Sequence, residues 1–111
     1  MLYEDTNSVI AALKALPAKD QTIVSTFVAE ALAKKLEQVQ KGESTYSEIV
    51  YLRDSMHTAF YDAREGGNKA GEVEAALMFH GAENLLNLCI ARAETERAAA
   101  IVQQRIINKL V

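Results

Sequence analysis

The residues best suited to chemistry lie in the second half of the chain, where His80 and Glu83 are three positions apart. On a helix this spacing brings an imidazole and a carboxylate to one face. The order is the reverse of the Glu-x-x-His element that binds metal in di-iron bundles, which also need a second such element and further inward carboxylates. This chain supplies one pair, on a face that helical periodicity directs outward. We therefore expect a solvated polar face, with no metal and no cofactor.

The position of His80 within a helix, in a chain with a four-helix outline, resembles histidine phosphotransfer domains. That resemblance implies an imidazole at His80 that accepts a phosphoryl group. The local signature of those domains is His-x-Leu-Lys-Gly, whereas residues 80–84 read HGAEN, with Glu83 in the place of the lysine. A carboxylate there repels a phosphoryl group. A histidine phosphotransfer-like bundle protein is therefore kept as an alternative only.

Two further residues, His57 and Cys89, are the remaining candidates for catalysis. Cys89 falls on an apolar helical arc with no His, Lys or Arg on its face to stabilise a thiolate, so we expect a structural thiol. A metal site built from His57 and His80 would require two helices to align by chance. The sequence has no phosphate-binding glycine loop, Ser-His-Asp pattern or His-Glu-x-x-His helix. We predict that the protein is not an enzyme.

A strip of large side chains at helical spacing is a candidate recognition surface. The strip consists of Tyr46, Arg53, His57 and Tyr61. Tyrosine and arginine are enriched at the hot spots of protein interfaces. The alternative is a boundary strip, whose long side chains cover the edge of a bundle while their polar tips stay in water. The sequence leaves both interpretations open.

Direct DNA binding is a second alternative function. Residues 16–21 (LPAKDQ) resemble the start of some helix-turn-helix units. A recognition helix presents Arg, Lys, Asn or Gln from its N-terminal end, and the helix that follows residue 44 offers only Arg53 in its first half. The 12 Lys and Arg residues are outnumbered by 15 Asp and Glu residues, whereas nucleic-acid binders usually carry a basic excess. A DNA-binding transcriptional regulator is therefore the alternative, and nucleic acid is disfavoured as a partner.

The elements that carry these residues are predicted to be helices. The 111 residues include one Pro, no Trp and only 6% aromatic residues, so few aromatic residues are present to favour β-strands. Breaks at Pro17, Gly42 and Gly66-Gly67 divide the chain into four segments. We predict a short helix near residues 6–16, helices at about 18–41 and 45–65, and a last helix from about 70 to 111. Thr6, Asn7 and Ser8 are candidate N-caps of the first helix, and Thr45 with Glu48 matches a capping box.

Apolar stripes at the 3.6-residue period are expected to face inward on these helices. On the second helix the stripe is Val24, Phe27, Val28, Ala31, Leu32, Leu36 and Val39, and on the third it is Ile49, Leu52, Met56, Ala59, Phe60 and Ala63. The second helix, the third helix and residues 70–93 would each be roughly 30 to 36 Å long. These matched lengths predict an all-α fold, an antiparallel three- to four-helix bundle with a long C-terminal helix, in a single domain spanning residues 1–111.

The pattern of the last helix changes after residue 91. Arg92 and Glu96 fall on the arc that is apolar before them, so residues 92–97 have no good core face. An apolar face then resumes with Val102, Ile106, Ile107 and Leu110. We accordingly separate a body, residues 1–93, from a helical extension, residues 94–111. Either the helix breaks near residues 94–95 and folds back, or it continues as an arm that packs on a second chain. We favour the arm.

These features predict a small non-catalytic protein that acts through protein–protein interaction, as an adaptor, a chaperone-like binder or an inhibitor. Its size and composition are typical of phage or mobile-element accessory proteins. The expected partners are a second copy, bound through the C-terminal helix, and an unidentified protein. No uncharged apolar run approaches the roughly 18 residues that span a bilayer, and the N-terminus is acidic where a signal peptide is basic. We expect a regulatory protein of the cytoplasm, of a bacterial cell or a host cell, without membrane contact.

Overall fold

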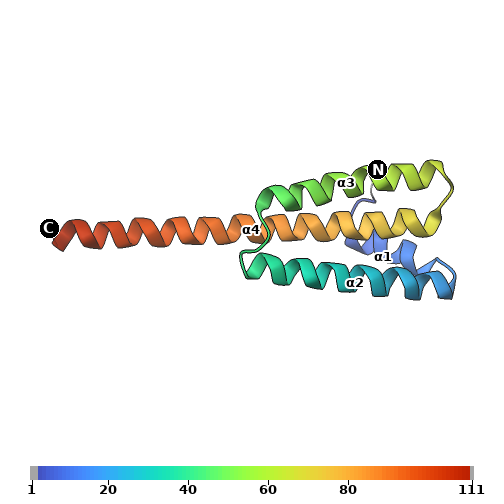
Figure 1. The fold of residues 1–111 in the computed structure, drawn as a ribbon, viewed down its shortest axis with the longest axis horizontal. Helices are drawn as coiled ribbons and strands as arrows, with labels where there is room; N and C mark the ends of the chain where they lie inside the picture. The colour runs from blue at the N-terminus through green and yellow to red at the C-terminus, as the bar shows by residue number, and fades with distance from the viewer. Residues whose placement is uncertain (1–2, 111) are drawn as a thin grey trace.

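The structure is a computed structural model that describes residues 3–110. Over that range it contains four α-helices and no strand, so the predicted all-α fold is confirmed. The helices are α1 (Thr6–Lys14), α2 (Ala18–Gln40), α3 (Tyr46–Glu65) and α4 (Lys69–Leu110). Successive helices run in opposite directions (Figure 1). Helix α4 continues to Leu110 without interruption, so the predicted long C-terminal helix is confirmed and the alternative break near residues 94–95 does not occur.

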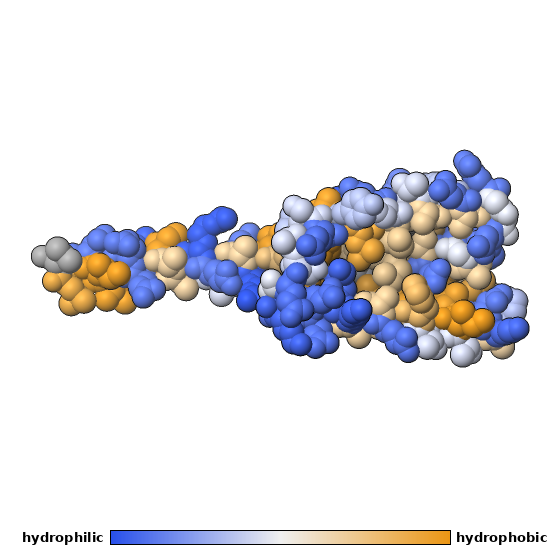
Figure 2. All heavy atoms as spheres, in the orientation of Figure 1, coloured by the Kyte–Doolittle hydropathy of each residue, from blue (hydrophilic) through white to orange (hydrophobic). Residues whose placement is uncertain are grey.

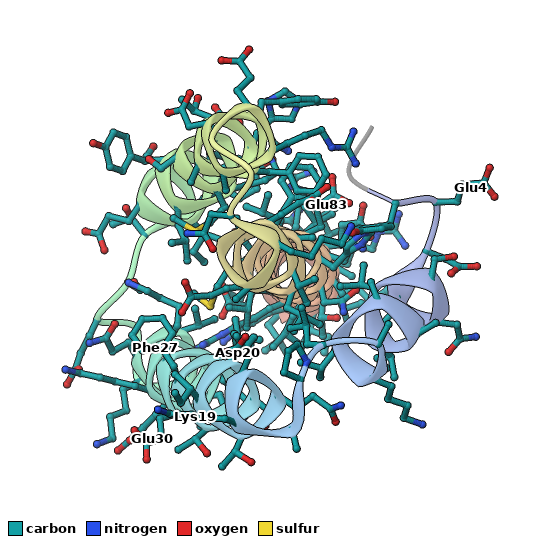
Figure 3. All side chains as sticks on the ribbon, turned by 90° about the vertical axis from the view of Figure 1, so that its right-hand side faces the viewer. Glu4, Lys19, Asp20, Phe27, Glu30 and Glu83 are labelled. Carbon is teal, nitrogen blue, oxygen red and sulfur yellow. The ribbon has the colours of Figure 1, made fainter. Side chains whose placement is uncertain are left out.

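The first half of α4 forms the centre of the bundle, and α1, α2 and α3 each pack against it (Figures 1 and 3). Its second half extends beyond the other helices, so the molecule measures 67 × 23 × 23 Å. None of the helices formed by residues 3–110 is long and apolar enough to cross a membrane.

The N-terminal caps agree with the sequence only in part. Asp5, rather than a residue from 6 to 8, caps α1, because its carboxylate accepts a hydrogen bond of 2.8 Å from the backbone N–H of Ser8. The hydroxyl of Thr45 caps α3 by accepting from the N–H of Glu48 over 3.2 Å. The carboxylate of Glu48 instead accepts from the hydroxyl of Ser44, at 3.0 Å. Of the two hydrogen bonds of a capping box, only the one that Thr45 accepts is therefore formed. The carboxylate of Glu48 binds Ser44 instead of the backbone N–H of Thr45.

Glycines end α2 and α3, as predicted. Gly42 and Gly67 have φ angles of 75° and 70°, a conformation that costs other residues energy. The N–H of Glu43 donates to the carbonyl of Gln38 over 2.8 Å, and that of Asn68 donates to Ala63 over 2.9 Å. These bonds satisfy carbonyl groups that the helix leaves without an internal partner. Each turn is therefore short and reverses the chain at once.

The hydrophobic core follows α4 through three clusters of buried side chains. Phe60, Ile49, Val9 and Val73 are the largest fully buried residues. The remaining buried apolar residues are Leu16, Val24, Val28, Val39, Ala75, Ala76, Met78, Ala82, Leu85 and Leu86. Helix α4 contributes to every cluster, which explains why it occupies the centre of the bundle.

Part of the apolar arc predicted to face inward is open to solvent, which corrects the stripe predicted for α2. Phe27 is 54% exposed and Leu36 is 37% exposed, and on α4 Leu88 is exposed as well. Phe27 is open because α2 and α3 do not pack on each other, since no Cα atom of one lies within 8 Å of a Cα atom of the other. Leu36 and Leu88 line a separate hollow between α2 and α4. Figure 3 shows Phe27 on the side of α2 that faces the gap toward α3. The bundle therefore leaves grooves beside α4.

Candidate functional site

The second half of α4 is an isolated helix. We call residues 91–110 the arm, because every one of them is exposed. The large apolar residues of the arm are Ile101, Val102, Ile106, Ile107 and Leu110, and Leu110 is 82% exposed. Figure 2 shows hydrophobic atoms gathered near the end of the arm. An exposed apolar patch of this kind is typical of surfaces that pack against another chain.

Arg92 fixes the point where the arm leaves the body. Its Nη1 donates hydrogen bonds of 3.3 Å to the carbonyl of Val39 and 3.4 Å to that of Gln40. Both carbonyls lie in the last turn of α2, and that of Val39 also accepts from the backbone N–H of Gly42 over 3.1 Å. The Nε of Arg92 also pairs with Glu96 at 3.1 Å. In the sequence, residue 92 was recognised only as a break in the apolar pattern. The signal for its contact with α2 is that arginine side chains can satisfy the carbonyls at a helix C-terminus.

Three of the four predicted arm residues share one helical face. Val102, Ile106 and Leu110 are spaced by four residues, which places them on a single side. The fourth, Ile107, lies about 100° round the helix from Ile106, at the edge of that side. The full stripe, which we call the arm stripe, is Leu88, Ala91, Thr95, Ala99, Val102, Ile106 and Leu110. Small side chains occupy its middle and large ones its outer end.

The arm stripe continues into a groove between α2 and α4, which we call the α2–α4 groove. It has a volume of about 470 Å³. Its lining is Leu32, Ala33 and Leu36 of α2 with Gly81, Asn84, Leu85 and Leu88 of α4. A Cβ atom on Gly81 would lie 2.6 Å from both methyl carbons of Leu32, so glycine allows the two helices to approach closely. Helix α1 contributes no residue to the lining of this groove.

Helix α1 packs on the part of α4 that precedes the groove. Val9 of α1 lies in one cluster with Ala75 and Ala76 of α4, and no residue of α1 lines the groove. Hydrogen bonds from Ser8 lower the pKa of the Asp5 carboxyl at the N-cap of α1, and the charge of His80 lowers it further. At nine residues, α1 is about 14 Å long, whereas α2 has 23 residues. Helix α1 therefore leaves the later part of α2, and the α2–α4 groove beside it, uncovered.

A second groove lies on the opposite side of α2, between α2 and α3. Its volume is about 430 Å³ beside Phe27, and a neighbouring hollow beside Tyr51 measures about 580 Å³. The two share Leu52 and Met56, so they form one continuous surface. Figure 2 views this face and shows hydrophobic atoms between the helices. The surface is large and apolar enough to accept part of another protein.

The predicted recognition strip lies on α3 beside α4. The His57 ring is 5.1 Å from that of Tyr61 and 6.0 Å from that of Phe79. Tyr46 and Arg53 line a hollow of about 190 Å³ next to α4. Tyr46 and His57 are exposed, and the other two are half-buried. The strip thus packs along the edge of the bundle with polar atoms outside, and its use in binding stays a prediction.

The residues considered for catalysis differ in exposure. Glu83 is exposed, as expected, but His80 is half-buried, which corrects its predicted outward position. Cys89 is half-buried against the cluster that includes Val39 and Leu85. Within residues 3–110, no three side chains of His, Cys, Asp or Glu gather into a metal-binding group.

Glu72 is a buried acid that the sequence analysis missed. Arg64 contacts its carboxylate at 2.8 Å and Lys69 contacts it at 3.3 Å. Burial by itself raises the pKa of Glu72, but the hydrogen bonds and charges of Arg64 and Lys69 outweigh it and lower the pKa. The group joins the end of α3 to the start of α4, and its role is structural. No sequence signal separates it from an ordinary acid in the first turn of a helix.

Comparison of the chain with protein-family models, with curated proteins and with solved structures found no match. The geometry of the arm, the two grooves and the strip on α3 is therefore the basis for a functional proposal.

Proposed function

We propose that this protein is a non-catalytic interaction protein of the cytoplasm that forms a homodimer through its arm and uses its body to bind another protein. The observation that carries the proposal is the arm stripe, in which Val102, Ile106 and Leu110 are exposed on one face of an unsupported helix. Isolated helices of this length are marginal in water unless an amphipathic face is packed. A second copy supplies that packing.

The body offers separate surfaces for a different partner. The groove between α2 and α3 exposes Phe27 and Tyr51, and the strip on α3 exposes Tyr46 and His57. Aromatic side chains of this kind serve as anchors in protein interfaces. An adaptor or an inhibitor needs this arrangement, with self-association at one end of the molecule and partner recognition at the other.

Light scattering with size-exclusion chromatography tests the arm. We expect the unmodified protein to be a dimer, and the Val102→Asp/Ile106→Asp variant to be a monomer with the helical circular dichroism of the body retained. Each buried aliphatic side chain contributes about 1.5–3 kcal/mol to such packing. Ile101→Asp is the matched control, because Ile101 is equally exposed but lies away from the arm stripe. A monomeric unmodified protein, or a dimer that survives the double substitution, would contradict the proposal.

A further inference from the structure

We propose that the arm of each copy lies antiparallel in the α2–α4 groove of the other copy. This inference rests on the proposed dimer and names the surface that receives the arm. It makes the interface symmetric, since each chain provides one arm and one groove. A symmetric exchange of this kind closes after two copies and leaves no arm or groove free for a third.

The groove and the arm stripe belong to one face of α4. From Gly81 to Leu110 the face spans 29 residue steps, about 44 Å of helix. Its midpoint falls between Thr95 and Glu96. Two copies related by a two-fold axis at that point place Leu110 opposite Gly81, Ile106 opposite Leu85, and Val102 opposite Cys89, next to Leu88.

In this register the large side chains of the arm stripe lie opposite the hollow groove, and its small side chains lie where the two α4 helices cross. The outer end of the arm stripe carries Val102, Ile106 and Leu110, and the groove that faces them is hollow around Gly81. Ala91, Thr95 and Ala99 meet their counterparts near the two-fold axis. Small side chains there allow two helices to approach closely, whereas bulky ones would hold them apart. The apolar groups left exposed by one copy are thus covered by the other.

Charge selects the antiparallel orientation. Residues 97–111 contain Arg97, Arg105 and Lys109 and no acidic residue, a net charge of +3. Residues 1–96 contain nine basic and fifteen acidic residues, 9 − 15 = −6. Parallel arms would bring three cations on one tip beside the same three on the other. Antiparallel arms bring each basic tip onto the body of the other copy, which is acidic overall.

Disulfide cross-linking tests the orientation. In a Cys89→Ala background, a chain with Leu36→Cys is mixed with a chain carrying Ile106→Cys under a glutathione redox buffer. We expect a cross-linked heterodimer, and no cross-link between two Ile106→Cys chains, whose residues 106 lie at opposite ends of the interface. Ile23→Cys replaces Leu36→Cys as the control, since Ile23 is an exposed apolar residue on another side of α2. Cross-linking of Ile106→Cys to itself, without capture by Leu36→Cys, would overturn the inference and leave the arm-mediated dimer intact.

Sedimentation equilibrium tests the groove separately. We expect Leu36→Glu to raise the dimer dissociation constant about tenfold or more, and Ile23→Glu to leave it unchanged. Circular dichroism and the melting temperature establish that both variants fold. If Leu36→Glu has no effect while Val102→Asp/Ile106→Asp gives monomers, the arm pairs elsewhere and this inference is wrong although the proposed function stands. If neither substitution affects the dimer, both are wrong.

Discussion

Arg92 of α4 donates a hydrogen bond from Nη1 to the carbonyl oxygen of Val39, the last buried residue of α2, over 3.3 Å. The contact joins residues 53 positions apart. It lies where α4 leaves the bundle, so it fixes the end of α2 against the base of the arm. The break in the apolar pattern at residue 92 therefore marks a structural junction.

Replacing Arg92 should destabilise the body. Arg92→Ala removes a side-chain hydrogen bond from the carbonyls of Val39 and Gln40, although Val39 keeps its bond from the N–H of Gly42. We expect a loss of about 1 kcal/mol in the free energy of unfolding. Thermal or urea unfolding followed by circular dichroism measures the change. Arg97→Ala is the control, since it removes the same charge from the exposed arm. Equal effects of the two substitutions would show that the contact with α2 contributes nothing.

The ion pairs of Glu72 should make stability depend on pH. Because the folded state lowers the pKa of Glu72, its contribution is complete above the pKa of the unfolded chain. The contribution is lost as pH falls through the folded pKa, below about pH 4.3. We expect Glu72→Gln to cost about 1.5–3 kcal/mol at pH 7, with a smaller difference from the unmodified protein at pH 3. Urea unfolding at both pH values measures it, and a difference independent of pH would refute this account.

The cap of α3 should depend on the hydroxyl of Thr45. Thr45→Ala leaves the N–H of Glu48 without its acceptor, and we expect a loss of about 1 kcal/mol in stability. Thr58→Ala is a suitable comparison, because Thr58 lies within α3 and its hydroxyl donates to the carbonyl of Asp54. Alanine is the better helix former there, so we expect little change. Chemical denaturation of both variants measures the difference.

Two phenylalanines should respond very differently to truncation. Phe60 is fully buried and packs edge-on against Tyr3 with ring centroids 5.8 Å apart, whereas Phe27 is 54% exposed. We expect Phe60→Ala to cost about 3–5 kcal/mol in stability and Phe27→Ala to change it by about 0.5 kcal/mol or less. Melting curves measure both. A large loss for Phe27→Ala would mean that its side of α2 is covered in solution.

Local rules determined the helices. Pro17, Gly42 and Gly67 mark their ends, and the absence of a glycine or proline near residue 95 predicted the continuous arm. The incomplete capping box at Thr45 and the cap of α1 by Asp5 differ from the predicted caps. Several side chains near the start of a helix can accept or donate a hydrogen bond, and only their positions in the folded chain decide which of them does. The spacing of Val102, Ile106 and Leu110 also placed them on one apolar face of the arm, whereas the continuation of that face through Leu88, Ala91 and Thr95 was not predicted.

Tertiary structure alone decided which apolar faces are covered. The stripe that includes Phe27 and Leu36 has helical spacing throughout, yet parts of it are open. Phe27 is exposed because α3 packs on α4 rather than on α2, and Leu36 is exposed because it lines the α2–α4 groove. Sequence periodicity indicates which face of a helix is apolar. Whether that face is buried depends on the number, length and placement of the neighbouring helices. The nine residues of α1 include Val9, which packs with Ala75 and Ala76 of α4, and none of them lines the groove. The α2–α4 groove is therefore open beside the base of the arm, a result of packing between segments that are distant in the sequence.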